Sequence, residues 1–464
     1  MPNSRDLARL LAWCAISWLL LAGCSSLPTI NPDLALPKRQ AVQLEGARGE
    51  LTAAQSKVIL DRLRSRSTAS NIFDRHLALE EAIVGSPLTT GNQVQLLQDG
   101  PATYRAMFAA ILAAKDHINL ETYILDDDEV GQKFAQALID KQQQGVQVNI
   151  IRDSVGTLGT PTAFFTRLSD VGVNVLEFNP VNPLSARKTW ALNQRDHRKL
   201  LIVDGAIAFL GGINISSVYS GGSFSQRARK ESEANLAWRD TDLQLQGPVV
   251  AEFQKLFLGT WAKQNGPPLA VRNFFPPPKV TGKQVVRAIG SSPSEPFSLI
   301  YATLLSAIGN AETSIYLTNA YFAPDPQLVA ALQAAAKRGV EVKLILPSQT
   351  DSWIVFHVGR GFYEQLLLVG VRVYERRDVI LHSKTALVDG VWATIGSTNL
   401  DWRSFLHNEE LNAVVLGTEF GSQVLAMFNK DMAASDEILL EEWQARPFNL
   451  RIKEMLSRVW EYWL

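Results

Sequence analysis

Two short motifs of identical spacing carry the side chains best suited to chemistry. Each motif reads His, any residue, Lys, four residues, Asp; the members are His197, Lys199 and Asp204, and then His382, Lys384 and Asp389. Seventeen residues after each His comes an Asn in a glycine turn, Asn214 in the first copy and Asn399 in the second. One His-x-Lys pair means little, but two copies with the same downstream spacing indicate a built site.

The motifs contain the groups that phosphodiester transfer requires. Residues i and i+2 of a strand face the same side, so the His and Lys of each motif project together. The glycine turn allows the Asn, and Ser397 in the second copy, to return to the same place. Transfer needs a nucleophile, a proton donor for the leaving alkoxide, and positive charge around the non-bridging oxygens. Paired His, Lys and Asn side chains supply all of these without a metal.

Other acidic residues are interpreted mainly as structural. Asp204 and Asp389 each lie an odd number of positions from their His and face the other side of the strand, so we favour a structural role for both. Residues 126–128 are three aspartates before a predicted helix, where capping is favoured over metal binding. Glu121 either lines the pocket or is a buried structural carboxylate, and both interpretations stay open. The sequence has no zinc spacing, P-loop or dinucleotide fingerprint, so we expect no metal or cofactor.

The elements around these motifs alternate between strand and helix. Periodicity predicts helices near Thr52–Ser65 and Ile72–Val84, strand Val94–Leu97, helix Tyr104–Ala114, strand His117–Ile124, helix Val130–Gln144 and strand Val146–Arg152. Such alternation is typical of an α/β fold with a mostly parallel sheet and helices on both faces.

The same order recurs in the second part of the chain. The first copy runs from Tyr123-Ile124 through a helix to residues 145–150, and the second from Tyr321-Phe322 through a helix to residues 339–344. A Pro-rich connection separates the copies. We therefore expect two similar α-β-α sandwich halves packed about a pseudo-twofold axis, with a mobile Ser/Gly-rich loop at residues 220–223. The expected boundaries are a signal peptide 1–23, a tether 24–50, a helical segment 51–92, a first half 93–262, a linker 263–282, a second half 283–440 and a C-terminal amphipathic helix 441–464.

The N-terminus has the layout of a bacterial lipoprotein signal. Arg5 and Arg9 precede an apolar run from Leu10 to Ala22, which is too short to span a bilayer. The run ends in residues 21–24, Leu-Ala-Gly-Cys, which is similar to a lipobox with Cys24 as the lipidated residue. Ser25 follows where Asp would favour retention, so the sequence favours the outer membrane over the inner membrane.

The last segment, from Phe448 to Leu464, is predicted to be an amphipathic helix with terminal aromatic residues. It either packs on the second half, which we slightly favour, or lies in a lipid interface. On the interfacial interpretation, truncation after Glu442 should leave a folded protein.

The paired motifs resemble those of the phospholipase D superfamily, and within it the bacterial cardiolipin synthases. Further resemblance lies in Pro87, Gly91-Asn92, Asp99-Gly100, Glu121-Thr122-Tyr123-Ile124 and the stretch GSTNLDWRSFLHNEELN from Gly396. The resemblance implies that one His attacks phosphorus and the other protonates the leaving alcohol, with His197 as nucleophile and His382 as acid. It also implies that a downstream carboxylate orients each His: Glu410 in the second half and Asp240 in the first. The first copy has Gly212 where the second has Ser397, so one hydroxyl is missing there.

The function predicted from this resemblance is phosphatidyl transfer to a phospholipid hydroxyl through a phosphohistidine. The expected partners are glycerophospholipids, such as phosphatidylglycerol or phosphatidylethanolamine, and a membrane surface. Hydrolysis of the same lipids, a secreted nuclease and a non-enzymatic lipid-binding lipoprotein are the alternatives. A net charge of −1 gives no positive field for nucleic acid, so we expect no nucleic-acid partner.

Overall fold

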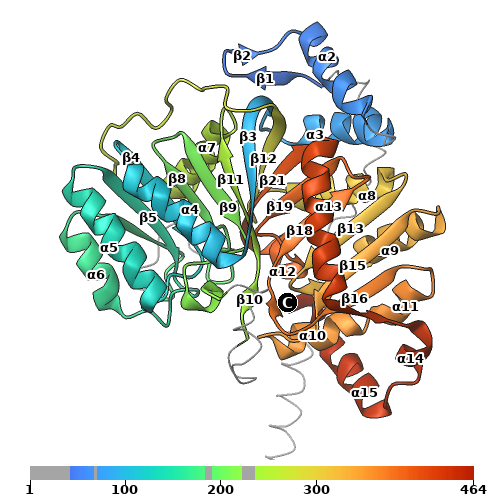
Figure 1. Ribbon diagram of the computed structural model, residues 1–464. Helices are drawn as coiled ribbons and strands as arrows, with labels where there is room; N and C mark the ends of the chain where they lie inside the picture. Colours follow the sequence, from blue (N-terminus) through green and yellow to red (C-terminus); the bar gives the residue numbers. More distant parts are fainter. Residues whose placement is uncertain (1–41, 67–69, 183–190, 222–235, 464) are drawn as a thin grey trace, which may run out of the picture.

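The computed structural model describes residues 42–66, 70–182, 191–221 and 236–463 (Figure 1). The predicted signal peptide, Cys24, most of the tether and residues 222–223 of the Ser/Gly-rich insert lie outside these ranges. Within them the chain forms two α/β halves side by side, the first ending with α7 (Val250–Lys263) and the second beginning with β12 (Gln284–Ser291).

The first half follows the predicted alternation of strand and helix. Its elements are β3 (Leu88–Gln98), α4 (Asp99–Ala113), β4 (His117–Thr122), α5 (Glu129–Gln143), β5 (Gln147–Asp153), α6 (Thr162–Asp170), β6 (Asn174–Phe178), β7 (Arg195–Asp196), β8 (Leu200–Val203), β9 (Ile207–Gly211), η3 (Ser217–Tyr219), β10 (Trp238–Arg239), β11 (Thr241–Gln246) and α7. Helix α5 begins where Asp128 accepts hydrogen bonds from the backbone of Val130 and Gly131, which is the capping role expected for the aspartate run.

The second half repeats this order. Its elements are β12, α8 (Leu299–Asn310), β13 (Ser314–Asn319), β14 (Phe322–Ala323), α9 (Pro326–Lys337), β15 (Glu341–Pro347), α10 (Trp353–Arg360), α11 (Tyr363–Leu367), β16 (Arg372–Arg376), β17 (Ile380–Leu381), β18 (Lys384–Val388), β19 (Trp392–Gly396), β20 (Leu400–Asp401), α12 (Trp402–Leu406), β21 (Asn408–Leu416), α13 (Thr418–Ala433) and β22 (Ser435–Ile438). Asp325 caps α9 and Pro326 fills its first turn, where a missing N–H costs nothing.

The strands pair in an order that reads as a palindrome of equivalent elements. From one edge the order is β6-β5-β4-β8-β9-β11-β3, then β12-β21-β19-β18-β13-β15-β16. The central pair, β3 and β12, is antiparallel, with Thr90 opposite Val285. A twofold axis between the halves would produce this order. The predicted fold of two similar α/β halves is thus confirmed.

The expectation of a mostly parallel sheet is wrong. In this order of strands, only the three at each outer edge pair in parallel, which are β4, β5 and β6 in the first half and β13, β15 and β16 in the second. The reason is connectivity, because parallel neighbours need a helical crossover. Strands β8 and β9, like β18 and β19, are instead joined by tight turns and pair antiparallel.

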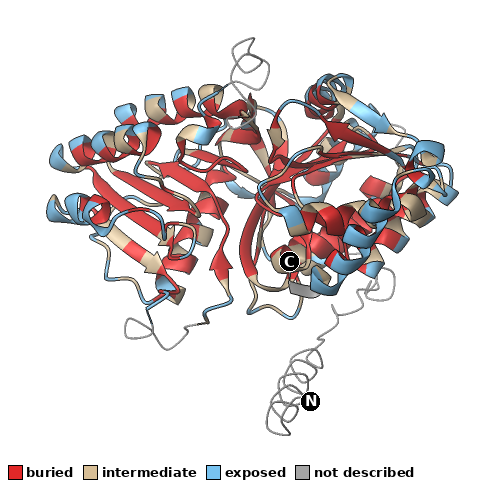
Figure 2. Cartoon of the chain, turned by 90° about the horizontal axis from the view of Figure 1, so that it is seen from below, coloured by how far each residue is buried: buried red, intermediate tan, exposed pale blue. Residues whose placement is uncertain are grey.

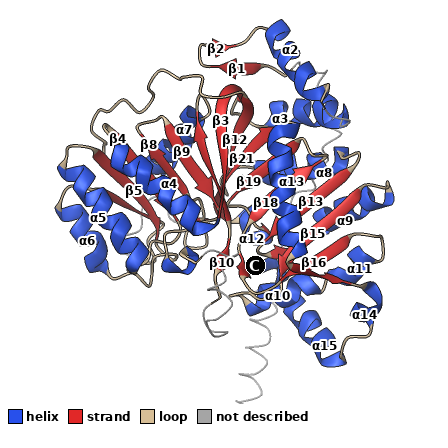
Figure 3. Ribbon diagram, viewed as in Figure 1, coloured by secondary structure: helices blue, strands red, loops and turns tan. Residues whose placement is uncertain are grey.

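Helices cover both faces of the sheet (Figure 3). In the first half, α4, α5 and α6 cover one apolar core, and in the second half α8, α9 and α11 cover another. Phe253 and Phe257 of α7 and Phe420 of α13 meet in a third core that strands of both halves share. The two halves are therefore joined by buried apolar surface as well as by the β3–β12 pair.

The N-terminal region is more ordered than a tether. A hairpin of β1 (Leu44–Gly46) and β2 (Gly49–Glu50) precedes α2 (Ala53–Arg64), η1 (Ile72–His76) and α3 (Leu77–Ile83). Strand β1 pairs in parallel with β3, which itself begins at Leu88, inside the predicted helical segment. The segment between α7 and β12 contains neither helix nor strand, as its prolines predict.

The C-terminal region contains α14 (Leu440–Gln444), α15 (Phe448–Ser457) and η4 (Arg458–Trp463). The apolar side chains of α15 and η4 point outward: Phe448 is 74% exposed, Met455 64% and Val459 61%. The buried residues of α15 are Glu454 and Ser457. The interpretation that the apolar stripe packs as core is therefore wrong. No helix in the described part of the chain combines the length and apolarity needed to cross a bilayer. Figure 2 shows that burial concentrates in the strands, with exposed positions on the outer helices.

Candidate active site

Both halves contribute to one cavity of about 340 Å³. Its lining residues are Tyr123, Ile124, Arg195, His197, Asn214, Trp238, Tyr321, Asp351, Ser352, Val355, His382, Asn399, Asp401, Arg403 and Asn408. The two histidines predicted from the repeated motifs therefore face the same space.

Two short strand pairings between the halves position these histidines. Strand β7 lies parallel to the start of β21, and the His197 N–H donates to Glu409 O at 3.0 Å. Strand β10 lies parallel to β17, and the His382 N–H donates to Arg239 O at 2.8 Å. Each histidine thus sits beside a strand of the opposite half.

As a result, the carboxylate beside each histidine comes from the opposite half of the molecule. His197 Nδ1 lies 3.1 Å from Glu410 Oε1, and His382 Nδ1 lies 2.7 Å from Asp240 Oδ2. The expectation that each carboxylate orients the histidine of its own half is wrong, because β7 and β17 pair across the molecule. Each carboxylate can accept a hydrogen bond from Nδ1–H, which leaves Nε2 of a neutral ring with its lone pair and Nε2 of a protonated ring with a proton to give.

Burial disfavours the charged form of both imidazoles. Burial and the charge of Lys199 together lower the pKa of His197 to about 4, although Glu410 opposes both effects. Burial also lowers the pKa of His382, where Lys384 adds to the effect and Asp240 opposes it. At neutral pH His197 is a neutral imidazole, which is the form that acts as a nucleophile.

Both motif lysines are buried beside their histidines. Lys199 Nζ donates to His197 O at 2.6 Å, and Lys384 Nζ donates to His382 O. Burial lowers the pKa of Lys199 to about 7 and that of Lys384 to about 8. A phosphate between them would stabilise the protonated form of each.

The two asparagines are held differently. Asn214 Oδ1 accepts from the backbone N–H of Ile124 at 3.2 Å, and its Nδ2 donates to the Tyr219 hydroxyl at 3.0 Å. Asn399 Oδ1 is buried and has no hydrogen-bond partner among the described residues. Since Asn399 lines the cavity, its amide is available to a ligand.

Space explains why the first motif has glycine where the second has serine. Ser397 donates its hydroxyl hydrogen bond to Glu410. A Cβ added to Gly212 would lie 2.2 Å from Asp240 Oδ1, so the carboxylate occupies the space that a serine side chain would need. The missing hydroxyl is therefore a consequence of the position of Asp240.

Four aromatic side chains surround the histidines, and the sequence had not assigned them to the site. Tyr123 contacts His197 edge-on with ring centroids 5.2 Å apart, and Tyr321 contacts His382 at 6.0 Å. Trp238 lies 5.0 Å from the His382 ring, and the Tyr219 hydroxyl lies 3.3 Å from His382 Nδ1. Tyr123 and Tyr321 occupy equivalent positions in the two copies of the sequence repeat, and that equivalence could have indicated their place in the site.

The motif aspartates lie away from the cavity. Asp204 accepts hydrogen bonds from three consecutive backbone N–H groups, those of residues 115–117. Asp389 accepts from the equivalent three, those of residues 312–314. Both aspartates have positive φ, 53° and 51°. Each carboxylate therefore ties the turn after its motif strand to the start of a neighbouring strand.

Glu121 is buried behind the site and does not line the cavity. Its Oε1 lies 3.8 Å from Arg198 Nη1, and burial raises its pKa to about 7. Arg198 in turn contacts Glu409 at 2.9 Å and the backbone oxygen of Glu410 at 3.0 Å. Glu121, Arg198 and Glu409 thus form a buried charged cluster that joins the two halves.

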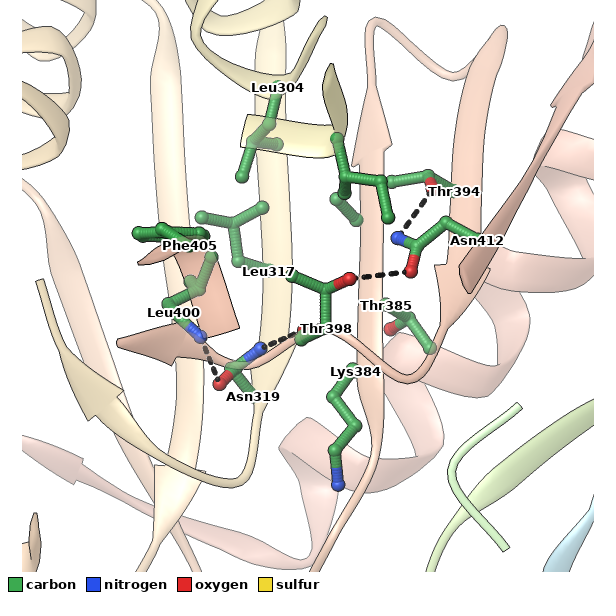
Figure 4. A pocket seen from close by; sticks show the side chains of 12 residues that line it. Leu304, Leu317, Asn319, Lys384, Thr385, Thr394, Thr398, Leu400, Phe405 and Asn412 are labelled. Carbon is green, nitrogen blue, oxygen red and sulfur yellow. Dashed lines mark hydrogen bonds between the residues drawn. The ribbon is translucent and has the colours of Figure 1, made fainter. Parts of the chain in front are cut away.

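A second cavity, of about 30 Å³, lies behind Lys384 (Figure 4). Leu304 and Leu317 line one side, and a hydrogen bond joins Asn412 to Thr394 on the other. The Lys384 ammonium points away from these leucines in Figure 4. The space is about the size of one water molecule and too small for a substrate.

The chain is similar to known proteins over most of its length. The family described as "Cardiolipin synthase, PLD-like domain" matches residues 107–261 and 304–432. The cardiolipin synthase of Geobacillus kaustophilus is 34% identical, and the match covers 82% of this chain and 74% of the relative. Cardiolipin synthase A of Pseudomonas putida is also 34% identical, with 80% and 76% covered.

The fold is similar to that of a solved enzyme structure. The crystal structure of phosphatidylserine synthase from Haemophilus influenzae matches with a TM-score of 0.60 and 13% identity, covering 80% of this chain and 95% of that one. This likeness shows a common fold. The family predicted from the paired motifs is confirmed by the sequence matches.

Proposed function

The chain belongs to the family of phospholipase D-like cardiolipin synthases, and on this basis we propose that it transfers a phosphatidyl group between glycerophospholipids at its paired-histidine cavity. The observation that carries the proposal is that two imidazoles from different halves line one cavity, each with a carboxylate on Nδ1. Cardiolipin synthase activity is the function of the relatives that match most of the chain.

In the first step, Nε2 of His197 attacks the phosphorus of the donor lipid. The bond from phosphorus to the headgroup oxygen breaks, and His382 gives its proton to that oxygen. The products are a phosphatidyl-histidine and a free alcohol, which is glycerol when the donor is phosphatidylglycerol. Lys199 and Lys384 neutralise charge on the non-bridging oxygens, and Asn214 and Asn399 donate hydrogen bonds to them.

In the second step, the hydroxyl of an acceptor lipid attacks the same phosphorus. His382, now neutral, takes the hydroxyl proton, the new phosphorus–oxygen bond forms, and the bond to His197 breaks. With phosphatidylglycerol as acceptor the product is cardiolipin. With water in place of the alcohol the product is phosphatidic acid, so hydrolysis is a side reaction of the same intermediate.

The assignment of roles follows the family resemblance. A neutral His197, whose pKa is lowered to about 4, suits a nucleophile. Burial also lowers the pKa of His382, but Asp240, 2.7 Å away, opposes that effect and stabilises the imidazolium that the acid requires. We propose phosphatidylglycerol as donor and acceptor, with phosphatidylethanolamine as an alternative donor.

We propose that the protein is held at a membrane in two ways. The exposed apolar side chains of α15 and η4 would enter the lipid interface, and Arg451 and Lys453 nearby would meet anionic headgroups. Cys24 would carry the lipid of an outer-membrane lipoprotein. Labelling cells with a palmitate analogue tests the anchor, because Cys24→Ser should abolish labelling and an unlabelled wild type would refute it.

Vesicles of phosphatidylglycerol test the activity directly. The purified chain should convert them to cardiolipin and glycerol, measured by mass spectrometry, and His197→Ala or His382→Ala should each reduce the rate by at least about a thousandfold. Phosphatidic acid as the sole product would make the protein a hydrolase instead. Absence of both products would refute the proposal.

A further inference from the structure

The active-site cavity is lined by two guanidinium groups that the two chemical steps leave unused. Arg195 belongs to β7 of the first half and Arg403 to α12 of the second half, and both line the cavity. The sequence had singled out neither residue. Two positively charged groups at the cavity favour the binding of a second anion beside the reacting phosphate.

Arg195 is a fixed cation. It is buried, and its Nη1 donates to Ser154 Oγ at 2.8 Å while its Nη2 donates to Asn179 O at 3.1 Å. Asp153 lies 3.6 Å from Nη1. These contacts hold the guanidinium in one orientation beneath the cavity surface.

Arg403 has no such anionic partner. Its Nη1 and Nη2 donate to the side chain and backbone oxygens of Asn193, each at 3.2 Å, and no carboxylate of the described residues forms an ion pair with it. Two carboxylates line the cavity. Asp351 accepts from the Tyr321 hydroxyl, and Asp401 accepts from the Ser404 N–H. The Arg403 charge opposes the burial that raises the pKa of Asp401, but the two side chains form no ion pair.

The two guanidinium groups also repel each other. Burial lowers the pKa of Arg195, Asp153 opposes that effect, and the Arg403 charge lowers the pKa further. Asp153 compensates the charge of Arg195, whereas Arg403 lines the cavity with no carboxylate of the described residues at ion-pair distance, so an anion bound beside Arg403 would be stabilised. A phosphodiester, which a guanidinium binds through paired hydrogen bonds, fits this arrangement.

The basic side chains lie near one another along the chain. Arg195 belongs to β7, and His197 and Lys199 follow it in the short segment between β7 and β8. An acceptor glycerophospholipid carries its own phosphate one glycerol unit away from the attacking hydroxyl. The second phosphate must therefore lie close to the reacting one, yet apart from the lysines.

We propose that Arg403, supported by Arg195, binds the phosphodiester of the acceptor lipid and thereby selects an anionic acceptor over water or a neutral alcohol. The inference rests on the proposed transfer function. The cavity then has two phosphate subsites: Lys199 and Lys384 bind the phosphate that reacts, and the arginine pair binds the phosphate that does not.

A competition between two acceptors tests this subsite. Phosphatidylglycerol vesicles with isotopically labelled glycerol allow two transfers from one intermediate: to lipid, giving cardiolipin, and to glycerol, giving labelled phosphatidylglycerol. Arg403→Gln should reduce the ratio of cardiolipin to labelled phosphatidylglycerol by about tenfold or more, since a charged hydrogen bond is lost. Arg403→Lys should retain part of the preference. Arg105→Gln, an exposed site on α4, is the matched control and should keep the wild-type ratio.

The possible outcomes distinguish failure of the second phosphate subsite from failure of the proposed phosphatidyl transfer. An unchanged ratio in Arg403→Gln, or an equal loss of both products, would overturn the second subsite while leaving phosphatidyl transfer intact. A wild type that forms neither product would refute the proposed function itself. Arg195 is not the residue to change, because its removal would leave Asp153 buried and unpaired, which destabilises the fold whatever the role of the site.

Discussion

At the scale of single residues, each histidine depends on a carboxylate from the opposite half. Glu410 contacts Nδ1 of His197, and Asp240 contacts Nδ1 of His382. Neither half alone therefore contains a histidine together with the carboxylate that orients it. The sequence predicted the His, Lys and Asn residues because their spacing repeats. It could not predict these contacts between the halves, because short pairings such as β7 with β21 join residues more than 200 positions apart.

These contacts between the halves predict which histidine pKa changes when each carboxylate is substituted. Glu410→Gln should lower the pKa of His197 further below 4, because the carboxylate opposes the effects of burial and Lys199. Asp240→Asn should lower the pKa of His382 and leave His197 unchanged. NMR titration of the chain with labelled histidine measures both, and a response of His382 to Glu410→Gln would contradict these contacts.

The buried lysines predict the pH profile. Their pKa values of about 7 and 8 mean that they lose charge as pH rises through that range, so kcat/KM should fall there. His382 must also be protonated to act as the acid, and because its pKa is lowered it loses its charge at a lower pH than the lysines do, so the fall begins there. On the acid side, His197 becomes protonated only as pH falls through about 4, which sets the other limb. Assays on a soluble short-chain phosphodiester avoid effects of membrane binding. Constant kcat/KM between pH 6 and about 10 would show that the lysine charges are not required.

At the scale of elements, the N-terminal helices are fastened to the second half by a buried ion pair. Glu80 of α3 lies 3.1 Å from Arg287 Nε of β12 and 3.0 Å from His76 Nε2. Burial alone would raise the pKa of Glu80, but the hydrogen bond from His76 and the charge of Arg287 lower it. The sequence predicted these helices from periodicity, yet not their docking, because the partners are about 200 residues apart.

This ion pair predicts a stability defect. Glu80→Gln leaves Arg287 with Glu81 as its remaining ion-pair partner and leaves His76 without its carboxylate, and it should cost about 3 kcal/mol in the free energy of unfolding. Because the folded pKa of Glu80 is lowered, its stabilisation is present above the ordinary value of 4.5 and is lost as pH falls through the lowered value. Glu419→Gln is the control, since Glu419 is exposed on α13 and forms no ion pair among the described residues. Equal denaturation midpoints for the two variants would contradict this prediction.

At the scale of the whole molecule, the two halves form one sheet and one cavity, and the outer end of the second half carries an exposed apolar surface. The duplication of motifs predicted the two halves. The surface on α15 and η4 was open to two interpretations, because a helical period shows that a stripe exists but not which way it faces. The burial of Glu454 and Ser457 on the inner side decides it.

The C-terminal surface predicts a separation of folding from membrane activity. Truncation after Glu442 would also remove Trp443, which is 4% exposed and packs 4.9 Å from the Tyr363 ring, so that variant changes the core together with the surface. The double substitution Met455→Ser and Trp460→Ser changes exposed side chains alone and should keep the fold. We expect it to lower the rate on phosphatidylglycerol vesicles at least about tenfold while activity on a soluble phosphodiester persists. Equal loss on both substrates would show that the surface is not a membrane contact.

The two halves are proposed to share one nucleophile, and trapping the covalent intermediate tests this most directly. Wild-type protein turning over phosphatidylglycerol is denatured in alkali, where the phosphorus–nitrogen bond survives, and its peptides are analysed by mass spectrometry. We predict at most one phosphatidyl group per chain, located on His197 and absent from His197→Ala. Phosphatidyl groups on both His197 and His382 of the same chain would mean that each half reacts alone, and would contradict the account.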